Sequence, residues 1–154
     1  MQQQRSNGGQ RSAVATGTVL DRQGRLMVHL VAPTVLVVDD DRDIREALSQ
    51  ALAEGGYTAV GVANGQEALR WLRTATLAPA LILLDLAMPV MNGWQFRSEQ
   101  QRDPGLAAIP VLIVSANAEG ARQAGALAAA GYLAKPVDAD QLLAWIRGLG
   151  CSRS

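Results

Sequence analysis

The chain has 154 residues, a length typical of one domain, and 49% of them are hydrophobic, which is enough to form a buried core. Lys and Arg total 14, as do Asp and Glu, so there is neither the basic excess of a nucleic-acid binder nor an acidic tail. No apolar run reaches the roughly 18 residues that a membrane span needs, and the N-terminus lacks the apolar core of a secretory signal. The single Cys151 cannot form an internal disulfide. These features predict a cytoplasmic protein without direct nucleic-acid or membrane contacts.

The first part of the chain differs in composition from the rest. Residues 1–33 are rich in Gln, Gly, Ser and Arg and show no clear period, apart from a short hairpin pattern at 16–31. We interpret them as an N-terminal extension that is flexible, a small β appendage, or the result of a wrongly assigned start, with Met27 as the alternative first residue. The domain itself is then expected over 34–150, followed by a short tail over 151–154.

The patterned region opens with the apolar run TVLVV at 34–38, which has the length and β-branched composition of a strand. An amphipathic helix is predicted over 43–56, where the Gly55–Gly56 pair ends it. A second strand over 58–63 and a second helix over 64–75 repeat this alternation. The first half of the region therefore reads as two strand-then-helix units.

The second half continues the alternation with a strand over 80–85, whose unbroken apolar run is typical of a parallel sheet covered on both faces. A weaker amphipathic helix follows over 92–103. The remaining predicted elements are a strand over 110–116, an Ala- and Gly-rich helix over 119–131, a short strand over 132–135 and a helix over 138–150. Five such units predict an α/β fold, a doubly wound five-stranded parallel sheet with helices on both faces.

Chemistry in an open parallel sheet is expected beyond the carboxyl ends of its strands. The residues that finish the predicted strands are Asp39 and Asp40, Asp85, Ser115 and Lys135. Carboxylates from two strands form the oxygen-rich pocket that Mg²⁺ prefers, and the Lys could balance charge or hold a phosphoryl oxygen. In such a pocket, the aspartate at the end of the buried third strand would be a nucleophile that forms an aspartyl phosphate.

Each of these residues also has an ordinary structural explanation. Asp41 is best explained as a helix N-cap or first-turn acid rather than as a ligand. Asp39 or Asp40 alone could likewise cap a helix, Ser115 alone could be a loop hydroxyl, and Lys135 alone a solvated base. Their joint occurrence at successive strand ends favours a site.

These segments resemble a response-regulator receiver domain, the CheY-like phosphoacceptor of bacterial two-component signalling, over about 34–147. The matching segments are VLVVDDDRDIREAL (35–48), LILLDLAMPVMNGWQF (81–96), IPVLIVSA (109–116) and YLAKPVDADQLL (132–143). The resemblance implies the flavodoxin-like strand order 2-1-3-4-5. It also implies a stand-alone receiver, since the chain stops soon after the last predicted helix and we expect no output domain.

The resemblance assigns roles to individual residues. Asp85 would be the phosphoacceptor, with Mg²⁺ held by Asp39, Asp40 and Asp85 and by the backbone carbonyl of Ala87. Ser115 would be the switch hydroxyl that turns toward the phosphoryl group.

Three further residues take roles by the same resemblance. Lys135 would contact a phosphoryl oxygen, and its bond to Pro136 would be cis. Tyr132 would be the switch aromatic, whose ring moves inward as the switch hydroxyl moves.

The leading hypothesis is therefore a signalling switch rather than an enzyme, although it assists its own phosphotransfer and dephosphorylation. A histidine kinase or a histidine phosphotransfer protein would phosphorylate Asp85. The face formed by the fourth helix, the fifth strand and the fifth helix would then bind a downstream protein target; a homodimer is left open.

Two other classes of function remain to be compared with it. A haloacid-dehalogenase-like phosphatase with an Asp nucleophile needs a second Asp two residues later, where this sequence has Ala87. A degenerate receiver that binds partners without phosphorylation would not need the full set of site residues at the strand ends.

Overall fold

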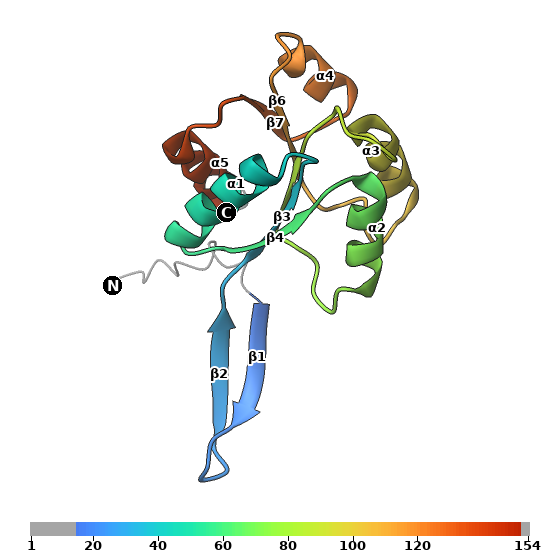
Figure 1. Ribbon diagram of the computed structural model, residues 1–154. Coiled ribbons are helices and arrows are strands. Elements are labelled where there is room, and N and C mark those ends of the chain that lie inside the picture. The colour runs from blue at the N-terminus through green and yellow to red at the C-terminus, as the bar shows by residue number, and fades with distance from the viewer. Residues whose placement is uncertain (1–14, 152–154) are drawn as a thin grey trace, which may run out of the picture.

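The computed structural model describes the backbone of residues 15–151 and the side chains of residues 20–26 and 32–149 (Figure 1). Five parallel strands form one sheet in the order β4-β3-β5-β6-β7, and a two-stranded sheet precedes it. Counted along the chain, the five strands have the order 2-1-3-4-5, which confirms the predicted fold. The strands of this sheet are β3 (Thr34–Val38), β4 (Thr58–Val62), β5 (Leu81–Leu84), β6 (Val111–Ser115) and β7 (Gly131–Ala134). The helices are α1 (Arg42–Glu54), α2 (Gly65–Thr74), α3 (Gly93–Arg102), α4 (Gly120–Ala126) and α5 (Ala139–Cys151).

The hairpin pattern found before the domain is a hairpin in the structure. Strands β1 (Ala15–Leu20) and β2 (Leu26–Val31) pair antiparallel, and Figure 1 shows them extending away from the five-stranded sheet. The Asp21 side chain accepts hydrogen bonds from the backbone N–H groups of Gln23 and Arg25, and Gly24 supplies the positive φ of 80° that this turn needs.

Helices cover both faces of the parallel sheet, because alternate residues of each strand point to opposite faces. Helices α2, α3 and α4 pack on one face, and α1 and α5 pack on the other (Figure 1). Strands β3, β5 and β6 lie in the middle of the sheet and are almost wholly buried, as their unbroken apolar sequences predict. The largest completely buried side chain is Phe96 of α3.

The fourth helix is shorter than the sequence pattern predicts. The helix expected over 119–131 spans only Gly120–Ala126, and the chain then turns at Ala128, which has a positive φ of 52°. This left-handed conformation is uncommon outside glycine and ends the helix. The alanine-rich sequence contains no glycine or proline at that point to indicate the stop.

Trp94 also departs from expectation. Its helical spacing from aliphatic residues predicts core or core-edge packing, yet it is 39% exposed on α3. The other two tryptophans, Trp71 and Trp145, do pack against the two cores. In the described part of the chain, the helices are too short or too polar to cross a membrane.

Candidate functional site

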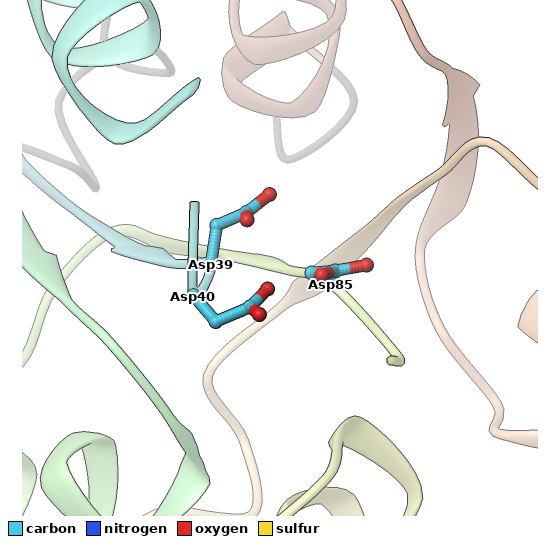
Figure 2. A group of neighbouring side chains, drawn as sticks. All are labelled: Asp39, Asp40 and Asp85. Carbon is cyan, nitrogen blue, oxygen red and sulfur yellow. The ribbon is translucent and has the colours of Figure 1, made fainter. Parts of the chain in front are cut away.

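Two neighbouring strands bring the acidic side chains together. Strands β3 and β5 pair in parallel with Val38 opposite Leu84, so the residues that follow them, Asp39 and Asp85, lie side by side. The backbone N–H of Asp85 donates to the carbonyl of Val38 at 2.9 Å, which extends the pairing to the start of the site. Figure 2 shows the carboxylates of Asp39 and Asp40 on the side where Asp85 lies.

The geometry of the three carboxylates fits a divalent cation. Asp39, Asp40 and Asp85 each offer an oxygen, and these oxygens lie within 4.8 Å of one another. Two oxygens on opposite sides of one Mg²⁺ are about 4.2 Å apart, because the Mg–O distance is about 2.1 Å. Small side-chain rotations would therefore let all three bind one ion. The exposed position of Asp40, beside the buried Asp39 and Asp85, leaves room for the waters that Mg²⁺ usually keeps.

Lys135 joins this cluster from the far end of the sheet. It directly follows β7, and its backbone N–H donates to the carbonyl of Ser115 at 3.0 Å. Its Nζ lies 2.6 Å from Asp39 Oδ2 and 3.6 Å from Asp85 Oδ1. The Lys135–Pro136 bond is cis, as the resemblance implied. Three carboxylates and one ammonium group carry a net charge of two negative units, which one divalent cation would neutralise.

The electrostatics of the cluster raise two pKa values. Burial raises the pKa of Asp85, and the negative charge of Asp39 adds to this effect, while Lys135 opposes it. Burial alone would lower the pKa of Lys135, but its hydrogen bond to Asp39 and the charges of Asp85 and Asp39 outweigh burial and raise it. Lys135 is therefore a firmly charged ammonium group, and Asp85 is a carboxylate that a cation would stabilise.

The third acid of the DDD run has a separate role. Asp41 is the N-cap of α1, and its side chain accepts hydrogen bonds from the N–H groups of Asp43 and Ile44 at 2.9 and 3.3 Å. This confirms the prediction that Asp41 caps a helix. Its own N–H donates to Asp39 Oδ1 at 2.9 Å, so the cap also orients the buried carboxylate.

Arg45 is a residue near the site that the sequence reasoning missed. Its guanidinium donates to the backbone carbonyl of Asp39 at 2.8 Å, and its side chain lies over Gly61 of β4. Its position in the sequence could have indicated this role. Arg45 lies one turn into the helix that directly follows Asp39 and Asp40, so its side chain can reach back to the end of the preceding strand.

The remaining predicted residues are Ser115, Tyr132 and Ala87. Ser115 ends β6 and is 6% exposed, and its Oγ accepts a hydrogen bond from the N–H of Asn117 at 3.1 Å. Tyr132 lies one strand farther from the acids. Its hydroxyl lies 3.3 and 3.2 Å from the carbonyl oxygens of Ser115 and Asn117 and can donate its one hydrogen to either, so it contacts the loop after β6. Ala87 is exposed in the loop two residues after Asp85.

Comparison with known proteins identifies the family of the chain. Residues 35–147 match the family described as the response regulator receiver domain. The chain is 39% identical over 118 residues to the DNA-binding transcriptional regulator NtrC of Escherichia coli, covering 73% of this chain and 24% of that protein. It is 38% identical over 117 residues to the response regulator MprA of Mycobacterium ulcerans, covering 75% of this chain and 49% of that protein. The chain thus spans a quarter to a half of the length of these relatives.

Solved structures resemble the fold along nearly their whole length. The chemotaxis response regulator CheY4 of Vibrio cholerae matches with a TM-score of 0.69 and 30% identity, covering 77% of this chain and 99% of that one. A response regulator receiver protein from Pseudomonas putida matches with a TM-score of 0.69 and 32% identity, covering 77% and 98%. The chain belongs to the receiver domain family of two-component response regulators, signalling switches that are phosphorylated on aspartate.

Proposed function

We propose that Asp85 is the residue phosphorylated in this receiver domain. The observation that carries the proposal is the convergence of Asp39, Asp40, Asp85 and Lys135 at the carboxyl ends of the strands. Of the three carboxylates, Asp85 ends the central strand β5, is 7% exposed, and has an oxygen 3.6 Å from the Lys135 ammonium group. Asp39 is more buried and closer to Lys135, but its Oδ2 accepts from Lys135 and its Oδ1 accepts from the N–H of Asp41. The Asp85 oxygen near Lys135 lies beyond hydrogen-bond distance, so Asp85 combines a protected position with a carboxylate oxygen free to attack and a cation close enough to reach the oxygens of an incoming phosphoryl group.

Asp39, Asp40 and Asp85 would hold Mg²⁺, with the backbone carbonyl of Ala87 as a further ligand. The bound ion would neutralise charge on the phosphoryl oxygens during transfer. The net charge of two negative units in the cluster supports a divalent ion, and the all-oxygen ligand set supports Mg²⁺ over softer metals.

Phosphorylation would proceed by attack of an Asp85 carboxylate oxygen on the phosphorus of a phosphohistidine, carried by a histidine kinase or a histidine phosphotransfer protein. An O–P bond forms, the P–N bond breaks, and its electron pair stays on the histidine nitrogen. Lys135 would move from Asp39 toward a phosphoryl oxygen, a shift that its long side chain allows. The Ser115 hydroxyl would leave the N–H of Asn117 and donate to another phosphoryl oxygen.

The segment that follows Ser115 would transmit the conformational change from the phosphorylation site to the surface. The Tyr132 hydroxyl lies within hydrogen-bond distance of the carbonyls of Ser115 and Asn117, so a displaced Ser115 would release or redirect the tyrosine ring. We propose that the surface of α4, β7 and α5 then changes its affinity for a downstream protein, in a cytoplasmic signalling pathway. The balanced charge of the chain favours a protein target over direct DNA contact.

Residues 34–150 would be the functional unit, with residues 1–33 as an extension outside it. A phosphatase acting on small phosphate esters is a poorer explanation of the site. Such an enzyme needs an acid two residues after its nucleophile to protonate the leaving group, and the side chain there is the methyl group of Ala87. A degenerate receiver is disfavoured because each residue of the acid and lysine cluster is present.

The test is phosphorylation by acetyl phosphate with Mg²⁺, followed by intact-mass measurement. The wild type should gain one phosphoryl group that neutral hydroxylamine removes, because an acyl phosphate is labile to that nucleophile. Asp85→Asn should gain none, and EDTA should abolish the gain in the wild type.

Asp43→Asn is the matched control, because it removes an exposed carboxylate from the first turn of α1. It should be phosphorylated like the wild type. Labelling of Asp85→Asn at the wild-type rate would refute the assignment of Asp85. Release of inorganic phosphate from a panel of sugar phosphates would favour the phosphatase.

A further inference from the structure

Helix α3 contains a buried polar pair outside the phosphorylation site. Arg97 is 6% exposed and Gln100 is fully buried, both on the face that packs against the sheet beside Phe96. Among the described residues, no carboxylate pairs with Arg97, and burial lowers the pKa of its guanidinium. Burying such a cation without a counter-ion costs stability unless its N–H groups are satisfied.

The partners of Arg97 lie at the end of another helix. Its Nε donates to the carbonyl of Leu127 and its Nη2 to the carbonyl of Ala128, each at 2.9 Å. Its Nη1 donates to Gln100 Oε1 at 2.8 Å. Leu127 and Ala128 follow the last residue of α4, where helix carbonyls lack partners and carry partial negative charge. One guanidinium therefore ties α3 to the C-terminal end of α4.

Gln100 completes this anchor. Both hydrogens of its amide nitrogen are used, on the carbonyls of Leu106 and Ile109 at 3.0 and 3.1 Å. The segment just past α4 is held to the sheet as well, because the N–H of Ala130 donates to the carbonyl of Val111 at 2.7 Å. The C-terminal end of α4 is thus fixed to α3 and to β6.

Within the described residues, no side chain of another helix hydrogen-bonds to the N-terminal end of α4, in contrast to the Arg97 bonds at its other end. Glu119 is at the N-cap position but makes no side-chain capping bond. The hydrogen bonds there run to Asn117, whose carbonyl accepts from the N–H of Gly120 and whose Oδ1 accepts from the N–H of Glu119. Tyr132 adds a hydroxyl 3.2 Å from the Asn117 carbonyl and a ring that packs against Gly120. Gln123, one turn into the helix, has a buried Oε1 without a partner, which the rest of the described structure does not satisfy. This end begins only five residues after Ser115.

We propose that α4 is hinged at its C-terminal end by Arg97 and Gln100, and that its N-terminal end is the part that moves when the domain switches. Arg97 and Gln100 are then positioning residues for the output surface. The movement would be started by the displacement of Ser115, and in this respect the inference rests on the proposed function. The difference in attachment between the two ends of α4 is present before phosphorylation. A downstream protein whose binding depends on phosphorylation would contact the first turn of α4 rather than its last.

The first measurement needs no variant. Amide hydrogen exchange of the unphosphorylated protein compares Gln123, whose N–H donates to Glu119, with Ala129 and Ala130, whose N–H groups donate to Ala124 and Val111. Because all three amides are hydrogen-bonded, differences report opening of the two ends. Exchange at Ala129 and Ala130 should be at least about tenfold slower than at Gln123 after correction for sequence. Equal protection at both ends would overturn the hinge.

The second measurement follows backbone NMR shifts on addition of Mg²⁺ and beryllofluoride, a phosphoryl mimic. In the wild type, changes should concentrate at Gly120 and Gln123 and leave Ala129 and Ala130 nearly unmoved. In Arg97→Met, which keeps the length of the side chain but not its donors, the changes should spread to Ala129 and Ala130, and their exchange should quicken.

Arg102→Met is the matched control on the same helix, because Arg102 is exposed and its ion pair among the described residues is with the exposed Glu99. It should behave as the wild type in both measurements. Shift changes of equal size at both ends of α4 in the wild type would refute the hinge. If beryllofluoride changes no shift anywhere, the phosphoacceptor proposal fails, whereas the exchange comparison still decides on the hinge by itself. Should Arg97→Met not fold, the wild-type comparisons decide alone.

Discussion

Lys135→Met tests how far one ammonium group holds the metal-free acid cluster together. Its Nζ lies 2.6 Å from Asp39 and 3.6 Å from Asp85, and its side chain is 15% exposed. At an effective dielectric constant of about 20, these distances correspond to attractions of about 6 and about 5 kcal/mol. Desolvation of the charges offsets much of this, and removing one partner from a buried pair costs about 3–5 kcal/mol. Because Lys135 keeps some contact with solvent, we expect a loss near the low end, about 3 kcal/mol.

Urea unfolding in EDTA at neutral pH measures this loss directly. Arg102→Met serves again as the control, because Arg102 pairs with Glu99 at 3.3 Å with 74% of its side chain exposed. An exposed pair of this kind contributes at most about 1 kcal/mol. If Lys135→Met loses no more stability than Arg102→Met, the carboxylates do not depend on Lys135 for neutralisation and the reasoning is refuted.

Mg²⁺ should partly compensate for the lost ammonium group. An ion present at about ten times its dissociation constant stabilises the folded state by about 1.4 kcal/mol. Lys135→Met should bind Mg²⁺ more tightly than the wild type, because Lys135 contacts two of the carboxylates that would bind the ion. The unfolding midpoint of the variant should therefore rise more steeply with added Mg²⁺. Identical midpoint shifts in both proteins would show that the lysine and the ion do not compete.

Four other substitutions separate the site from its surroundings. Asp85→Asn should stabilise the metal-free protein at pH 7, because burial raises the pKa of Asp85 and the folded state then binds a proton more tightly than the unfolded chain. In EDTA, the difference in the free energy of unfolding between this variant and the wild type should shrink as the pH falls through that raised pKa. A difference that stays constant into acidic pH would contradict this. Gly120→Ala would place a Cβ inside the ring of Tyr132, so it should cost about 1–3 kcal/mol in urea unfolding and shift the tyrosine ring resonances; unshifted resonances would count against the packing. Asp41→Ala should cost about 1 kcal/mol as a lost N-cap without weakening Mg²⁺ binding, whereas Asp40→Ala should weaken Mg²⁺ binding in calorimetric titration with little change in stability.

The sequence predicts the sheet well because its central strands have an unambiguous signal. β3, β5 and β6 are buried on both faces, so each is a short run of aliphatic residues between polar segments. Once those strands are parallel, Asp39 and Asp85 must lie at the same edge, since the register places Val38 opposite Leu84. Proximity within the acid cluster therefore follows from topology, without any knowledge of side-chain positions.

Sequence reasoning fails where polar residues are buried and apolar ones are exposed. The amphipathic pattern of α3 looks weak because its inward face includes Arg97 and Gln100, residue types that are usually exposed. Trp94 on the same helix is expected in the core or at its edge and is 39% exposed. The early end of α4 at Ala126 is not predicted either, because the positive φ of Ala128 that follows it leaves no mark in composition.

The missed anchor and the shortened α4 have one physical explanation. An alanine-rich segment has a strong tendency to continue as a helix, so something must stop it at Leu127. Arg97 does so by binding the carbonyls of Leu127 and Ala128, which further turns of helix would have used. The hydrogen bonds of this buried cation favour one geometry of the surrounding backbone. The acid cluster around Asp85, by contrast, carries a net charge of two negative units and would be stabilised by a bound cation. A change at the acid cluster should therefore move the N-terminal end of α4 more readily than the C-terminal end, which Arg97 holds in place.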